Sequence, residues 1–178
     1  MREISAEQAH LFVHNVVLGN LKNESRTTRS VLAAVPNSNL DYRPDPFAKT
    51  ANELLRHIAS ADNFFLKSVV DGAFVPGSVR IPDNANTPEK VVEWYEEEYK
   101  RNFEAVTKLT GEQLIMTVDF RRLFERPAYT YLLAGLLHTV HHRGQLSIYL
   151  RSLGGKVPAI YGESYDSAEA KRTTQTQA

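Results

Sequence analysis

The stretch HTVHHRGQL, residues 138–146, places three of the chain's six histidines within five positions of an apolar segment. An α-helix turns by about 100° per residue, so with His138 at 0° the side chain of His142 lies near 40° and that of His141 near 300°. The apolar side chains that follow on the same helix occupy an arc between about 20° and 120°. His138 and His142 therefore face the interior one turn apart, a spacing that lets two imidazoles bind one metal ion, and His141 does not.

Start and stop signals place this helix and three others. Capping boxes open helices after Ser5 and Thr50, a proline at the first helical position opens the one at Pro88, and Arg126-Pro127 precedes the fourth. Apolar residues then recur at steps of three and four until Pro or Gly interrupts them. The expected helices run from about residue 6 to 34, 51 to 71, 88 to 110 and 127 to 153.

The connections between these helices differ in length. About 15 residues rich in Pro, Gly, Asn and Asp join the second and third helices, enough to cross a bundle rather than form a tight hairpin. The connection before the fourth helix contains LIMTVDF, residues 114–120, a candidate for a short extended segment. We therefore predict an all-α four-helix bundle with a long crossover between helices 2 and 3, formed by a single domain of residues 1–165 and followed by a polar tail at 166–178.

Composition narrows the range of functions. The 178 residues are 42% hydrophobic, enough for one domain with its own core. Lys plus Arg and Asp plus Glu are both 21, so no excess of positive charge favours nucleic acid as a partner. The chain has no cysteine, so a metal ion would be bound by nitrogen and oxygen alone. Neither a leader nor a run of about 20 apolar residues is present, so we expect a soluble, cytoplasmic protein without a membrane partner.

A third metal ligand is available on the second helix. His57 lies in its second turn, at the edge of the apolar face. Taken alone, an i,i+4 histidine pair is more often structural than metal-binding, and the same holds for a single histidine such as His57. However, burying three unpaired imidazoles would cost free energy at each, whereas a shared ion satisfies all of them. His10 and His14, in the first turns of helix one, are interpreted as structural or surface residues.

Four segments in order resemble the DinB/YfiT superfamily of bacterial helical proteins. They are YRPDP at 42–46, ELLRHIASADNFFL at 53–66, HxxxHRGQ at 138–145 and RSLGGKVPAIYGES at 151–164, and together they span nearly the whole chain. The resemblance implies an up-down-down-up bundle that binds one divalent metal ion through three histidines, one from the second helix and two from the last. By motif these are His57, His138 and His142, the same three selected above.

Two classes of function remain open. Three histidines leave a coordination position for water or substrate, as in catalytic zinc sites. The resemblance implies thiol-dependent enzymes, since the family includes bacillithiol S-transferases and a mycothiol-dependent isomerase. We therefore expect a metal-dependent enzyme of the thiol S-transferase or hydrolase type acting on a small molecule such as a low-molecular-weight thiol. The alternative is a non-catalytic metal-binding or stress-associated structural module. Zinc is the expected metal and nickel the alternative, because imidazole suits both.

The fourth helix carries further candidate positions. Leu133, Leu137 and Val140 lie near 200° to 260°, opposite the histidines, and predict a homodimer unless the crossover or the LIMTVDF segment covers them. Tyr149 is a pocket residue or a core aromatic. Gln145, near 340°, either orients a ligand or is solvated, and Arg143 is expected at the surface or at an interface.

Overall fold

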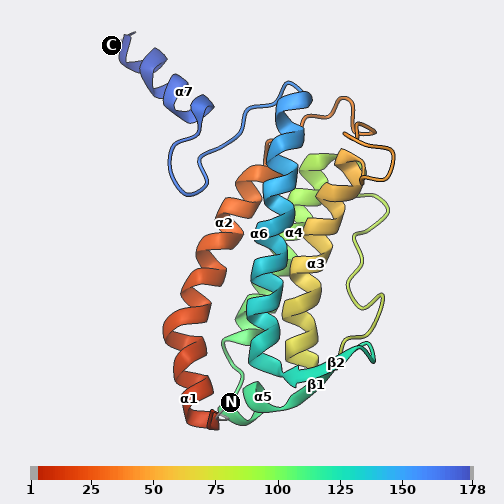
Figure 1. Ribbon diagram of the computed structural model, residues 1–178, viewed down its shortest axis with the longest axis vertical. Helices are drawn as coiled ribbons and strands as arrows, with labels where there is room; N and C mark the ends of the chain where they lie inside the picture. Colours follow the sequence, from red (N-terminus) through yellow and green to blue (C-terminus); the bar gives the residue numbers. More distant parts are fainter. Residues whose placement is uncertain (1–3, 177–178) are drawn as a thin grey trace.

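The first long helix begins where Ser5 and Gln8 form their capping box. In the computed structural model, which describes residues 4–176, α1 (Ala6–Phe12) continues through a π-helical segment (Val13–Val17) into α2 (Leu18–Ala33). The three pieces form one rod that runs from the bottom to the top of the molecule (Figure 1). The expected boundaries of this helix agree with the structure, and the π-helical turn is an addition that periodicity alone does not indicate.

Two helices then run in the opposite direction. Thr50 and Glu53 cap α3 (Ala51–Asp71), and Gly72 ends it with the left-handed backbone conformation, at φ 67°. The following residues, 73–87, return along the outside of the molecule, so that α4 (Pro88–Val106) also runs downward in Figure 1. Thr87 caps α4 and Pro88 occupies its first turn. The long crossover thus allows two consecutive helices to point the same way.

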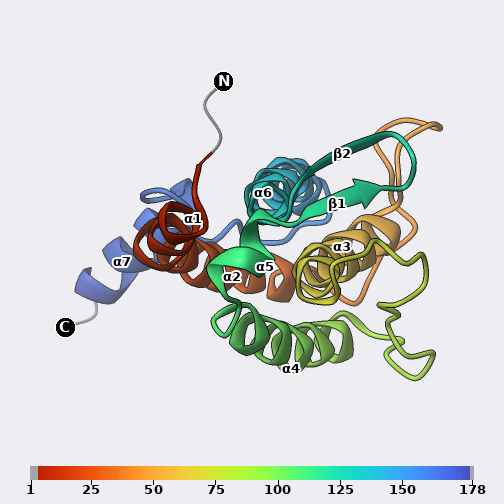
Figure 2. The same ribbon diagram turned by 90° about the horizontal axis from the view of Figure 1, so that it is seen from below.

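The chain is not entirely α-helical. After the short helix α5 (Gly111–Ile115), strands β1 (Thr117–Phe120) and β2 (Phe124–Pro127) pair antiparallel, with Thr117 opposite Pro127. Figure 2 shows the resulting hairpin extending beside α3 and α6. The all-α prediction is therefore wrong for this segment, and the candidate extended segment 114–120 supplies the first strand. Its turn is closed by two residues with positive φ, Arg121 and Arg122.

The last long helix, α6 (Ala128–Ser152), packs against α3 and α2. Its approach to α3 requires a glycine, because a Cβ on Gly135 would lie 2.6 Å from Cβ of Phe65. The core between the helices is built from buried aliphatic and aromatic side chains, among them Leu55, Ile58, Tyr131 and Leu146. Consequently the facing turns of α3 and α6 are held at short range.

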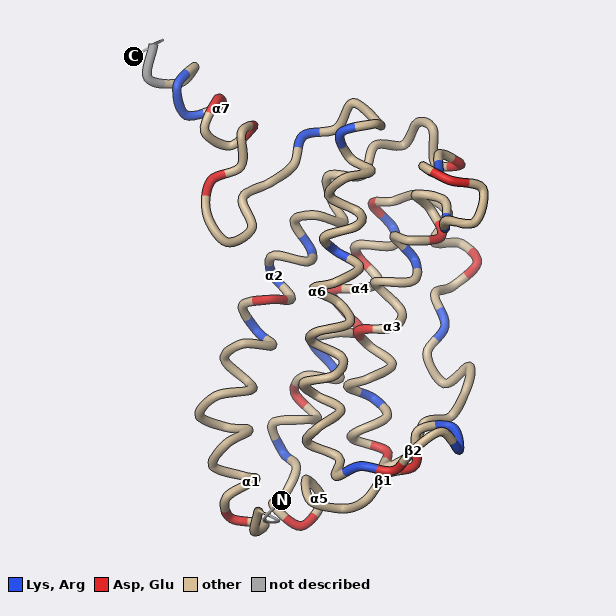
Figure 3. Tube along the Cα trace, in the orientation of Figure 1, with Lys and Arg blue, Asp and Glu red and all other residues tan. Residues whose placement is uncertain are grey.

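The C-terminal segment has more regular structure than the sequence suggests. Residues that we treated as a polar tail form α7 (Tyr165–Thr176), which projects away from the long helices in Figure 1. Residues 177–178 of that tail, like residues 1–3, lie outside the described part of the chain. Over residues 4–176 no helix has the length and apolar character needed to cross a membrane. Basic and acidic residues are interspersed on α2, α3 and α4 (Figure 3).

Candidate metal centre

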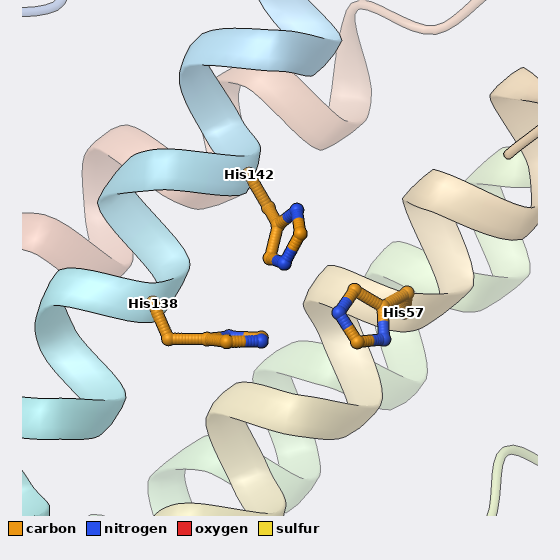
Figure 4. Close-up of side chains that lie close together, drawn as sticks. All are labelled: His57, His138 and His142. Carbon is orange, nitrogen blue, oxygen red and sulfur yellow. The ribbon is translucent and has the colours of Figure 1, made fainter. Parts of the chain in front are cut away.

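Three histidines converge between α3 and α6. His57 projects from α3, and His138 and His142 project from α6 toward it (Figure 4). Each offers one ring nitrogen such that these atoms all lie within 4.8 Å of one another. The ring centroid of His57 lies 5.0 Å from that of His138 and 4.5 Å from that of His142. The structure thus brings together the three residues that helical phase and motif selected, in a group that could hold a metal ion.

One ring is oriented by a neighbour on its own helix. Nδ1 of His142 lies 2.7 Å from Oε1 of Gln145, so this Nδ1–H donates to the amide oxygen and Nε2 keeps its lone pair. The amide nitrogen of Gln145 lies 3.2 Å from Nε2 of His141, which is exposed and is not a member of the group. Gln145 therefore orients a candidate ligand, as one of the two interpretations from the sequence anticipated.

Partial burial keeps the rings uncharged. Desolvation, followed by the charges of neighbouring histidines, lowers the pKa of His138 to about 4, and desolvation followed by His142 and Lys49 lowers that of His57 to about 4. Desolvation is also the main cause that lowers the pKa of His142. Nδ1 of His138 is buried and has no hydrogen-bond partner among the described residues. Neutral imidazoles with an unsatisfied nitrogen are the state that a metal ion needs.

The histidines lie where two surface hollows adjoin. The upper hollow, about 530 Å³, is lined by Phe47, Lys49, His142, Ile148 and Tyr149 among others. The lower hollow, about 300 Å³, is lined by residues of α3, the crossover and the hairpin, including His57, Phe64, Val79 and Arg121. Because His57 and His142 are in ring contact, a small molecule in either hollow would reach the group. Tyr149 is both buried and part of the pocket wall.

Arg143 corrects an expectation from the sequence. We expected it at the surface or at an interface, but it is only 1% exposed. Its guanidinium pairs with Oε2 of Glu24 at 2.6 Å and donates to the hydroxyls of Thr28 and Tyr161, at 3.1 and 2.7 Å. Helical phase placed it just outside the apolar arc, and a buried ion pair can extend the interior beyond that arc. The residue after His142 thus fixes α6 to α2.

A second polar residue was missed inside the apolar segment IASADNFFL. Asp62 on α3 is buried, and its Oδ2 accepts a hydrogen bond of 2.7 Å from the hydroxyl of Tyr95 on α4. A charged residue within an otherwise apolar helical stripe was the available signal. His10 and His14 stack on each other with centroids 4.0 Å apart and are not members of the three-histidine group.

Comparison with known proteins identifies the family. The model of the DinB family matches residues 12–176, so this chain belongs to the DinB family. It is similar to the uncharacterized protein YjoA of Bacillus subtilis (strain 168), with 22% identity over 142 residues that cover 79% of this chain and 90% of YjoA.

Solved structures agree in fold. The crystal structure of the DinB-like protein YjoA from Bacillus subtilis superposes with a TM-score of 0.69 and 20% identity, covering 83% of this chain and 99% of that one. A DinB-like protein from Bacillus cereus ATCC 10987 gives a TM-score of 0.67 and 22% identity, covering 82% of this chain and 95% of the other. The DinB-like fold is thus shared, and sequence identities of 20% and 22% support similarity of fold only.

Proposed function

We propose that His57, His138 and His142 bind one divalent transition-metal ion, with zinc as the expected metal and nickel as the alternative. The observation that carries this proposal is the convergence of three ring nitrogens within 4.8 Å, from two helices that Gly135 allows to approach closely. The low pKa values of His57 and His138, about 4, leave both imidazoles neutral at physiological pH. The proposed scaffold is an up-down-down-up four-helix bundle whose hairpin and crossover border the site.

A catalytic role fits the site better than a structural one. Within residues 4–176 the ligand group contains three histidines and no carboxylate, which leaves at least one coordination position open. An ion bound there would act as a Lewis acid that lowers the pKa of a thiol or of water. The chain's own residues would orient His142 through Gln145 and accommodate a small substrate in the adjoining hollows.

We therefore propose a metal-dependent enzyme of the thiol S-transferase or hydrolase type. The support is the resemblance described above, together with a donor set that lacks a fourth protein ligand among the described residues. The alternative, a non-catalytic metal-binding or stress-associated module, would require a closed coordination shell. X-ray absorption of the metal-loaded protein distinguishes the two. An oxygen or nitrogen ligand in addition to the three imidazoles, displaced when a thiol is added, supports catalysis. A closed shell that does not change with thiol supports the alternative.

We also propose a homodimer. Leu137 is 66% exposed on α6, so neither the crossover nor the LIMTVDF segment covers it. Leu133 and Val140 are half-buried beside it. An exposed leucine on a helix that is apolar on nearly every side favours a protein partner over water.

The test of the metal site is metal content. Protein purified without an affinity tag or chelator should contain about one transition-metal ion per chain by mass spectrometry, as expected for a single site. The variant His142→Ala should lose the ion, whereas the matched control His141→Ala, an exposed histidine one position away, should retain it. A native protein that takes up neither zinc nor nickel after reloading would overturn the proposal.

A further inference from the structure

The chemistry of the upper hollow indicates what kind of molecule it binds. Its wall combines apolar side chains with one basic residue, Lys49, and contains no carboxylate. Phe47 is 99% exposed and Ile148 70% exposed at its rim, although side chains of this size are usually covered. A ligand with an apolar body would cover them.

Lys49 is held at this position by the fold. Its backbone carbonyl accepts a hydrogen bond of 3.1 Å from the hydroxyl of Tyr149, whose ring packs edge-on against Tyr42 at 5.7 Å. The segment before α3 is also tied down by its backbone, since the amide of Ala51 donates to the carbonyl of Tyr42 at 2.8 Å. The backbone of the loop is therefore held at Lys49 by Tyr149 and at Ala51 by Tyr42.

The charge of Lys49 is available to a ligand. Lys49 forms no ion pair with any residue in the described range 4–176. Glu53 interacts electrostatically with Lys49, and its Oε2 already accepts a hydrogen bond of 2.7 Å from the amide of Thr50. The ammonium group acts electrostatically on both His57 and His142, so its field reaches the candidate metal centre.

The lower hollow repeats this charge pattern. Arg121, at the turn between β1 and β2, lines it together with His57, and this wall also lacks a carboxylate. The turn is basic in Figure 3. A divalent ion between two basic residues, with no acidic residue in either wall, would give a site of strongly positive potential.

We propose that the upper hollow binds a small anionic ligand with an apolar body, whose anionic group pairs with Lys49 beside the metal ion. The inference rests on the proposed metal site and specifies its substrate class. A neutral ligand of the same shape would leave the positive charge of Lys49 unpaired next to a divalent ion. Charge complementarity therefore provides selectivity in addition to that of the apolar walls.

The experiment first measures zinc binding by calorimetry and then titrates the zinc-loaded protein with two probes. The probes are 3-mercaptopropionate and 3-mercapto-1-propanol, which share a thiol and differ in the carboxylate. We expect 3-mercaptopropionate to bind about fivefold more tightly than 3-mercapto-1-propanol, a difference in affinity typical of an exposed ion pair. Lys49→Gln should abolish this preference and Lys49→Arg should keep it.

Controls separate this inference from the proposed function. Lys90→Gln, an exposed lysine on α4 that lines neither hollow, should preserve the preference. A loss of the preference in Arg121→Gln but not in Lys49→Gln would overturn the assignment to Lys49. If the protein binds zinc but binds both probes with equal affinity, the anionic ligand is overturned. If the preference survives Lys49→Gln, the pairing with Lys49 is overturned. Both outcomes leave the metal site intact. Absence of zinc binding would overturn both.

Discussion

At the scale of single residues, burial decides the charge state of Asp62. Desolvation raises its pKa to about 6, against the opposing effects of the hydrogen bond from Tyr95 on α4 and the charge of Arg143 on α6; Tyr99 on α4 also faces it. The folded chain therefore binds more protons than the unfolded chain, where the pKa is near 3.8. As the pH rises from about 4 to 6, the free energy of unfolding falls, by about 3 kcal/mol for a shift of about 2 pH units.

The variant Asp62→Asn tests this effect, because the amide cannot ionise and still offers an oxygen to Tyr95. We compare the free energy of unfolding of the variant with that of the native protein by urea unfolding at pH 4.5 and pH 7.5. We expect this difference to shift in favour of the variant by about 1–3 kcal/mol from the lower to the higher pH. The control Asp83→Asn changes a side chain that is 87% exposed, and its effect should be the same at both pH values. A constant difference for Asp62→Asn would mean that Asp62 is ionised throughout.

At the scale of elements, the distance between α3 and α6 determines whether a three-histidine group exists. Gly135 lies one turn before His138, and an added Cβ would lie 2.6 Å from Cβ and 2.8 Å from Cγ of Phe65. Those atoms are close to the backbone of α3, so a rotamer change cannot relieve the overlap and the helices must separate. The separation would also move His57 away from the other two histidines.

We expect Gly135→Ala to lower the free energy of unfolding by about 1–3 kcal/mol and to weaken zinc binding. Gly144→Ala is the matched control on the same helix, since nothing lies within 4 Å of its added Cβ. That variant should be neutral or more stable by up to about 1 kcal/mol, because alanine favours the helix. Denaturant unfolding of both variants measures the difference, and equal effects would contradict a close approach at Gly135.

At the scale of the whole molecule, the exposed apolar face of α6 bears on assembly. Sedimentation equilibrium of the native protein at micromolar concentration should give the mass of a dimer. Leu137→Asp should shift it to the monomer, because a carboxylate in an apolar interface is costly to desolvate. Leu123→Asp, which changes a similarly exposed leucine (73%) at the hairpin turn, should remain dimeric. A native monomer at that concentration would contradict the proposed homodimer.

The whole molecule also determines how a ligand reaches the site. The segment before α3, the crossover and the β1–β2 turn come from separate parts of the sequence, and their side chains line the two hollows next to the histidines. Lys49 and Arg121 are two such residues. Neither belongs to a motif that marks it as functional, because the sequence does not indicate which loops meet beside which helix.

The sequence by itself determined the long helices and the residues of the candidate site. Capping boxes, proline and glycine act within a few residues, so they placed the helix boundaries, and helical phase with motif order separated His138 and His142 from His141. Metal binding by these residues stays a prediction. The sequence indicated residues 114–120 as an extended segment but not the strand that pairs with it. The buried positions of Arg143 and Asp62, and the basic side chains of Lys49 and Arg121 beside the histidines, were decided only by the tertiary structure. Each depends on a partner distant in sequence, such as Glu24 for Arg143, Tyr95 for Asp62 and Tyr149 for Lys49, and long-range contacts of this kind leave no local signal.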